Sequence, residues 1–341
     1  MNTAEEIAYN FFLSLLAIII IFLNIALLLS CRKNPSPETE PELEDSSPAA
    51  AKARAYQLSD IDAATDGFNP LRIIGQGSSG TVYAAVFPGD DDLVAVKRIH
   101  PSLVLLNAGG FEFSSVIKTL SSAHHPNIAP VLGFSQAPGE RIVVMEFIGI
   151  QNLNHLLHES PDGASLLDWR RRLTIAAGVA RGIEYLHERM SAPGGTIHGC
   201  VKPSKVLIDE RFRAKVCDYG IRFNGRRRGI VGYVDAEYWN RGASKESDVY
   251  GFGVVLLELL TGRKSEEGLL VKWAVPLLKE MRFGEVLDPR LVAPSDMKMI
   301  VRLGKVASAC VGNCRMSRPT MVQVAAILNC LELDHDRFGF D

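Results

Sequence analysis

The chain has 341 residues, of which 47% are hydrophobic, and its 37 basic side chains nearly balance its 39 acidic ones. This composition excludes a disordered chain and a collagen-like chain, and the near-neutral charge argues against a nucleic-acid binder. The six cysteines are too widely spaced for the disulfide framework of a small secreted domain, so we expect reduced thiols in the cytosol.

The first predicted element is a membrane-spanning helix at residues 7–29, behind a short extracellular N-terminus, residues 1–6. The helix carries no charged side chain and would be about 35 Å long, which exceeds the ~30 Å hydrocarbon core of a bilayer. A cleaved signal peptide is the alternative, but the acidic N-terminus and the lack of a small-residue cleavage site favour an anchor. Because Arg32 and Lys33 follow the helix, we expect a single-pass protein, in the plasma membrane, with its C-terminal part in the cytosol.

The segments beside this helix are too short or too polar to fold alone. An N-terminus of this length cannot form a ligand-binding domain, so we expect no ectodomain and an upstream signal that arrives through a partner. Residues 30–55 are rich in Pro and Glu, which predicts a flexible juxtamembrane linker. Cys31 lies at the membrane boundary, either as a palmitoylation site or as an ordinary thiol.

A helix and then two strands joined by a glycine-rich turn are predicted after the linker. Residues 56–68 have apolar side chains at helical spacing, and residues 73–87 alternate as strands do. The glycines of the turn are Gly75, Gly77 and Gly80. In a dinucleotide-binding fold this G-x-G-x-x-G spacing opens a helix, whereas here a strand follows. Glycine lets the backbone approach phosphates closely, and Lys97 on the next strand would supply the counter-charge.

A glycine hairpin followed by a strand with a lysine is the arrangement of protein kinases. The chain resembles plant receptor-like kinases over about residues 56–333, which leaves residues 334–341 as a tail. The segments that extend the resemblance are His124–Phe134, Arg141–Ile148, Leu166–Glu188, Ser247–Lys264 and Met316–Val324. The segment VKWAVPLLKEM is similar to the crinkly-type receptor kinases. The resemblance implies an α+β, bilobal protein-kinase-like fold with a β-rich small lobe and a helical large lobe.

The resemblance also implies a binding site for ATP, with or without magnesium. Met145 would be the gatekeeper of this site, and Asp218 would be the magnesium ligand. In the large lobe, Glu237 would form a structural ion pair with Arg318. The residues implied in nucleotide binding are Ile74, Gly75, Gly77, Gly80, Val82, Ala95, Lys97, Met145, Ile148, Leu207 and Asp218.

The catalytic loop, residues 198–209, departs from the kinase pattern at three positions. Cys200 stands in the place of the aspartate that acts as base, and Gly199 in that of the arginine that docks a phosphorylated activation loop. Loss of a general base lowers a rate by about 10²–10⁴, and a thiol is mostly protonated at neutral pH. Lys205 replaces the magnesium-binding asparagine, so its cation would compete with the metal.

The small lobe carries another departure. Val116 stands where the family has the glutamate that pairs with the strand lysine. Glu112 lies four residues earlier, so it could substitute from the same helical face, or it could be a solvent-exposed side chain.

The activation segment, residues 221–232, contains no Ser, Thr or Tyr that could accept a phosphate. Ile230 and Ala236 replace the threonine and proline with which the family docks substrate peptides. Arg226–Arg228 form a basic run, which either meets an acidic partner or a phosphate, or is solvated surface.

Two further groups of residues receive structural interpretations. Cys310 and Cys314 are four residues apart on a predicted helix, which favours a buried helix face over a metal site. Arg170–Arg172 are expected at the surface of the large lobe.

The departures at Val116, Gly199, Cys200 and Lys205 together predict a pseudokinase. It would act as a scaffold or allosteric partner of other receptor-like proteins or kinases in the membrane and of cytosolic signalling proteins, without a role in nucleic-acid binding. The alternatives are an atypical, weakly active serine/threonine kinase and a sensor that binds ATP without turnover.

Overall fold

The computed structural model describes residues 53–106, 112–149, 151–190, 195–221, 230–266, 268–294 and 296–338. Every described residue belongs to one compact unit, residues 50–341. The expected membrane span at residues 7–29, Cys31 and Arg226–Arg228 lie outside the described residues. Within the described part of the chain, no helix is both long enough and apolar enough to cross a membrane.

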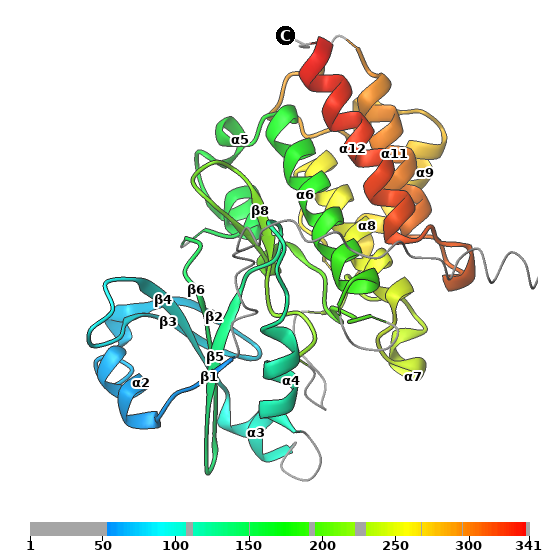
Figure 1. The fold of residues 1–341 in the computed structure, drawn as a ribbon. Coiled ribbons are helices and arrows are strands. Elements are labelled where there is room, and N and C mark those ends of the chain that lie inside the picture. The colour runs from blue at the N-terminus through cyan, green and yellow to red at the C-terminus, as the bar shows by residue number, and fades with distance from the viewer. Residues whose placement is uncertain are drawn as a thin grey trace, which may run out of the picture. The chain divides into compact units, whose positions relative to one another are not determined.

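A six-stranded sheet forms the small lobe (Figure 1), in the order β1-β5-β6-β4-β3-β2. Its strands are β1 (Arg54–Ala55), β2 (Ile73–Gly77), β3 (Gly80–Val86), β4 (Leu93–Ile99), β5 (Val131–Ala137) and β6 (Glu140–Glu146). Strand β1 pairs with β5 in parallel, and the other pairs are antiparallel. The last two residues of the expected linker therefore extend the sheet.

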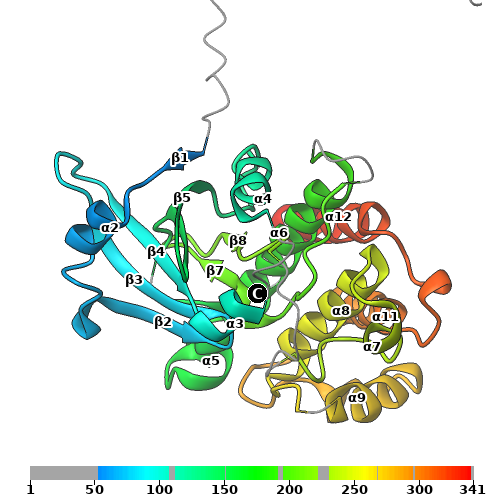
Figure 2. The same cartoon turned by 90° about the horizontal axis from the view of Figure 1, so that it is seen from below.

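Three helices accompany the sheet. Helix α2 (Leu58–Ala64) buries Ile61 and Ala64 in a small cluster with sheet residues such as Val96 and Val144. Helix α4 (Phe113–Leu120) buries Phe113, Ile117 and Leu120 in the main core instead. Helix α3 (Pro101–Leu106) precedes α4 in the chain (Figure 2). The apolar residues of α2 and α4 recur at a spacing of three or four, which gives each helix one face to bury.

The large lobe is built around two long helices, α6 (Trp169–Glu188) and α8 (Lys245–Thr261). Its other elements are η2 (His155–Glu159), α5 (Gly163–Leu166), η3 (Pro203–Lys205), β7 (Val206–Ile208), β8 (Ala214–Val216), α7 (Tyr238–Arg241), α9 (Leu269–Lys279), α10 (Phe283–Val286), α11 (Lys298–Cys310), η4 (Arg315–Ser317) and α12 (Met321–Phe338). Ser244 and Ser247 form a capping box at the start of α8, whose side chains are buried on nearly all sides. The expected division into a β-rich small lobe and a helical large lobe is thus confirmed.

The expected ion pair between Glu237 and Arg318 is wrong. Arg318 pairs instead with Asp235, which also accepts hydrogen bonds from Arg315 at 2.9 and 2.8 Å. Asp235 is buried, whereas Glu237 is partly exposed and pairs with Arg241 one helical turn later, at 3.0 Å. Asp235 pairs with both arginines because an unpaired charge is costly at a buried position.

Two smaller expectations also fail. Arg172 is 1% exposed rather than at the surface, and it donates to Asp288 at 2.7 Å and to the carbonyl oxygen of Leu259 at 2.6 Å. Cys310 is buried, but Cys314 lies beyond the end of α11 and is exposed, so the two thiols share no buried helix face.

Candidate functional site

A cleft with a cavity volume of about 170 Å³ opens between the glycine-rich hairpin, strand β4, the segment after β6 and the catalytic loop. The structure brings together in this cleft all eleven residues that the sequence singled out for nucleotide binding. The cleft also contains residues that the sequence reasoning missed: Gln76, Ser78, Ser79, Ala129, Glu146, Phe147, Gly149, Asn152, Lys202, Ser204 and Cys217. Most of these adjoin a residue that was singled out, so proximity in sequence was the available signal.

The hairpin requires a glycine at position 80, where strand β3 begins. Gly77 pairs with Gly80 across the turn, and a Cβ on Gly80 would lie 2.2 Å from the carbonyl oxygen of Arg98. Strand β4 then runs beside β3, with Lys97 opposite Val82. This register places the buried ammonium of Lys97 in the cleft, beneath the hairpin.

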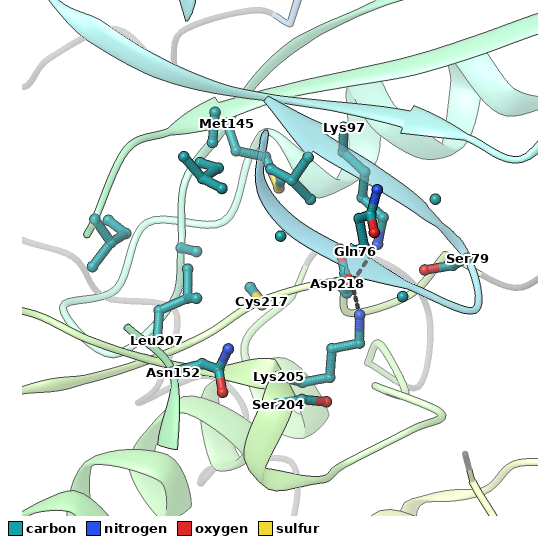
Figure 3. Close-up of a pocket in the computed structure, with 18 of the residues that line it drawn as sticks. Gln76, Ser79, Lys97, Met145, Asn152, Ser204, Lys205, Leu207, Cys217 and Asp218 are labelled. Atoms are coloured by element: carbon teal, nitrogen blue, oxygen red, sulfur yellow. Dashed lines mark hydrogen bonds and ion pairs between the residues drawn. The ribbon is translucent and has the colours of Figure 1, made fainter. Parts of the chain in front are cut away.

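Two ammonium groups converge on one carboxylate at the base of the cleft. Lys97 Nζ and Lys205 Nζ both donate to Oδ2 of Asp218 (Figure 3). The backbone fixes Lys205 in place, since its N–H donates to the Lys202 carbonyl at 2.9 Å and its carbonyl accepts from Cys217 N–H at 3.0 Å. Asp218 itself has a φ of 59°, a left-handed conformation that Asp tolerates better than most residues. The cluster therefore joins the small lobe, through Lys97, to the large lobe.

The pKa values of the three groups reflect this arrangement. Burial lowers the pKa of Lys97 to about 8, although Asp218 opposes that shift. Burial also disfavours charge on Lys205, but the carboxylate of Asp218 raises the pKa of this lysine above its ordinary value. Burial alone would raise the pKa of Asp218, and the ammoniums of Lys205 and Lys97 instead hold it well below its usual range. Asp218 is thus an anion, and Lys205 is its counter-ion.

The side chains around Asp218 do not suit a magnesium ion. Magnesium prefers an octahedron of oxygen ligands, usually with one or two carboxylates. Asp218 stands at the magnesium-ligand position, and the ammoniums of Lys97 and Lys205 both form ion pairs with its Oδ2. Within the described ranges, no group of three or more His, Cys, Asp or Glu could hold a metal ion. The expectation that Asp218 binds magnesium therefore conflicts with the lysine beside it.

The catalytic side of the cleft is narrow. A cavity of only about 20 Å³ lies there, which is room for about one water molecule. Its walls include Ile99, Cys200, Ile221 and Ile230 together with the lysine–aspartate cluster. Cys200 is 7% exposed, so a thiol faces the space in which a kinase base would meet the substrate hydroxyl.

The catalytic loop keeps its backbone support although its chemistry has changed. Asp248 of α8 accepts from the N–H groups of His198 and Gly199 at 2.7 and 2.8 Å, and lies 3.0 Å from His187 Nε2. Gly199 has a φ of 82°, a conformation that favours glycine. The loop therefore has a stable shape without an acid at position 200.

The suggestion that Glu112 substitutes for the missing helix glutamate is wrong. Glu112 is exposed and lies at the N-cap of α4, where its ψ of 77° is not helical. Val116 packs against the main core. Among the described residues, the ion pair of Lys97 is with Asp218 instead.

Known proteins are similar to this chain in sequence and in fold. The family model "Protein tyrosine and serine/threonine kinase" matches residues 68–328. The probable serine/threonine-protein kinase PBL6 of Arabidopsis thaliana is 34% identical over 300 residues, which cover 82% of this chain and 69% of PBL6. The leucine-rich repeat receptor protein kinase EMS1 of the same plant is 35% identical over 290 residues, which cover 80% of this chain and 24% of EMS1.

A solved structure points the same way. It is the pseudokinase domain of BIR2, described as an immune regulator of the RLK/Pelle family. It matches with a TM-score of 0.70 and 32% identity, over 86% of this chain and 92% of that one. The chain therefore belongs to the protein tyrosine and serine/threonine kinase family, and within it to the plant receptor-like kinase/Pelle group.

Proposed function

We propose that this protein is a membrane-anchored receptor-like pseudokinase that acts as a scaffold or allosteric partner in a cytosolic signalling complex. The observation that carries the proposal is the hydrogen bond from Lys205 to Asp218. The Lys205 ammonium binds the carboxylate with which a working kinase coordinates magnesium. Phosphoryl transfer depends on metal ions that neutralise the developing charge. A lysine in place of the asparagine at position 205 therefore removes the contribution of the metal ion as well as that of the asparagine.

The other departures add to this effect. Loss of the base at Cys200 lowers a rate by about 10²–10⁴, from a typical kinase turnover of about 1–100 s⁻¹. The narrow cavity beside Cys200 also leaves little room for a substrate hydroxyl. Together with the loss of the metal position, these departures lead us to expect phosphotransfer below the level of detection.

The proposed partners are other receptor-like proteins or kinases in the membrane and cytosolic signalling proteins. Relatives of this chain include a receptor protein kinase, and the BIR2 structure is described as that of a pseudokinase domain from an immune regulator. The proposed location is the plasma membrane, with the kinase-like domain in the cytosol, as the sequence of residues 7–33 predicts. A close relation to the crinkly-type kinases stays a prediction from residues 271–281.

A phosphotransfer assay on the purified full chain in detergent tests the proposal. Radiolabelled ATP, magnesium and a mixture of generic peptide substrates would be supplied, with Lys97→Ala as the matched control. We expect the wild type and the control to give the same background. Magnesium-dependent incorporation that Lys97→Ala abolishes would show that the protein is an enzyme.

An atypical, weakly active serine/threonine kinase is the second candidate, because Lys97, Asp218 and the glycine hairpin all line one open cleft. Several relatives are also named as serine/threonine kinases. This candidate predicts a detectable rate that rises when Cys200→Asp and Lys205→Asn are combined. If neither the wild type nor the double variant phosphorylates any substrate, this candidate loses its support.

A further inference from the structure

The charge of the cleft is unusual for a site that would take a metal–nucleotide complex. Lys97 and Lys205 line its inner end, and among the described residues that line this end Asp218 is the acidic one. The two ammoniums share one carboxylate oxygen, so the cluster keeps a net positive charge after their pairing. A buried net positive charge attracts anions and repels divalent cations.

The ammoniums also keep hydrogen-bonding capacity. A lysine carries three N–H donors, and each bond to Asp218 uses one of them. Among the described residues, Lys97 and Lys205 donate to no acceptor other than Asp218. The spare donors lie beneath the glycine hairpin, which is the place where phosphate oxygens would be held.

The outer part of the cleft remains suited to a flat apolar group. Its walls include Val82, Ala95, Met145 and Leu207, and its volume of about 170 Å³ contrasts with about 20 Å³ on the catalytic side. These walls suit a nucleobase, whereas a metal ion at Oδ2 of Asp218 would have to displace the Lys205 ammonium.

We infer that the Lys205 ammonium takes the place of magnesium in this cleft, so that the protein binds a nucleoside triphosphate as its metal-free anion and magnesium weakens that binding. The inference rests on the proposed function, since an active kinase would need the metal. It concerns binding alone, and no bond is formed or broken.

Calorimetric titration of the full chain in detergent with ATP tests the inference, once in EDTA and once in excess magnesium. We expect the wild type to bind ATP more tightly in EDTA, on the order of tenfold, which is a usual size for the coupling between two ligands. Lys205→Asn removes the ammonium and restores a metal-binding amide, so this variant should bind ATP more tightly in magnesium.

Two further variants separate charge from folding. Lys205→Met removes the ammonium without offering a metal ligand, so it should weaken binding in EDTA and gain no magnesium dependence. Lys279→Asn makes the same substitution as Lys205→Asn at an exposed position, the last residue of α9, and should behave as the wild type. Thermal unfolding of each variant without nucleotide would show that it is folded.

Several results would overturn the inference. They are wild-type binding that is tighter in magnesium, binding that is equal in both buffers, the absence of binding in either buffer, and a Lys205→Asn variant with the wild-type preference. None of these results depends on phosphotransfer. If the protein binds no nucleotide, the proposed scaffold role is unaffected, whereas kinase activity in the earlier assay would overturn that role directly.

Discussion

Replacing Asp218 with Asn is the most informative perturbation of the cleft, because it leaves two buried ammoniums without an anion. Removal of one partner from a buried ion pair destabilises a protein by about 3–5 kcal/mol. The side chains of Asp218 and Lys205 are 11% and 20% exposed, so water relieves part of this penalty. We therefore expect Asp218→Asn to lower the free energy of unfolding by about 3 kcal/mol.

The same reasoning predicts a rescue. Adding Lys205→Asn to Asp218→Asn removes one of the two unpaired ammoniums, so the double variant should be more stable than the sum of the single effects predicts. Contacting charged residues show coupling of about 0.5–3 kcal/mol in such cycles. Lys97 would relieve part of the remaining charge by losing its proton, since its pKa is already about 8.

Urea unfolding of the full chain in detergent, followed by tryptophan fluorescence, measures both quantities. The midpoint and the slope would be fitted for the wild type, the two single variants and the double variant. A change of less than about 0.5 kcal/mol for Asp218→Asn, or additivity in the cycle, would refute the view that these residues form one charge cluster.

Three more predictions concern residues at or near the site. The folded chain releases the Lys97 proton near pH 8 and the unfolded chain near 10.5, so Lys97 makes the free energy of unfolding rise with pH in this interval. Urea unfolding at pH 8 and 10 should therefore show a difference between the wild type and Lys97→Met that grows with pH. A difference that is the same at both pH values would contradict this prediction. Gly220→Ala should destabilise by about 1–3 kcal/mol in thermal unfolding, because φ is 69° and the new Cβ would lie 2.7 Å from Leu120 Cδ2; a neutral effect would refute this. Asp235→Ala should destabilise by about 3–5 kcal/mol and Glu237→Ala by less than about 1, and the reverse order would restore the ion pair first expected for Glu237.

The parts of the fold that sequence could predict are those with a strong local signal. The glycine hairpin and the strand that carries Lys97 follow from residue spacing, and the structure places the associated residues in one cleft. The sequence also predicted a cation at position 205 in competition with the metal. It could not predict that Lys97 and Lys205 meet on the same oxygen of Asp218, because that depends on side-chain conformations from three separate segments.

Two of the wrong predictions have a common physical cause, which is burial. Asp235 and Glu237 are two residues apart and chemically alike, so nothing in the sequence indicates that Asp235 is the buried one. Arg172 belongs to a run of three arginines that suggested solvent, yet its guanidinium reaches Asp288 in the core, 116 residues later in the chain. The error at Glu112 is local, since α4 begins one residue after it.

The central proposal is that this kinase fold does not transfer phosphate. The most direct test is magnesium-dependent phosphotransfer by the purified full chain, measured against Lys97→Ala. Our account predicts the same background for both proteins at every magnesium concentration. Incorporation by the wild type that rises with magnesium and is absent in Lys97→Ala would contradict it.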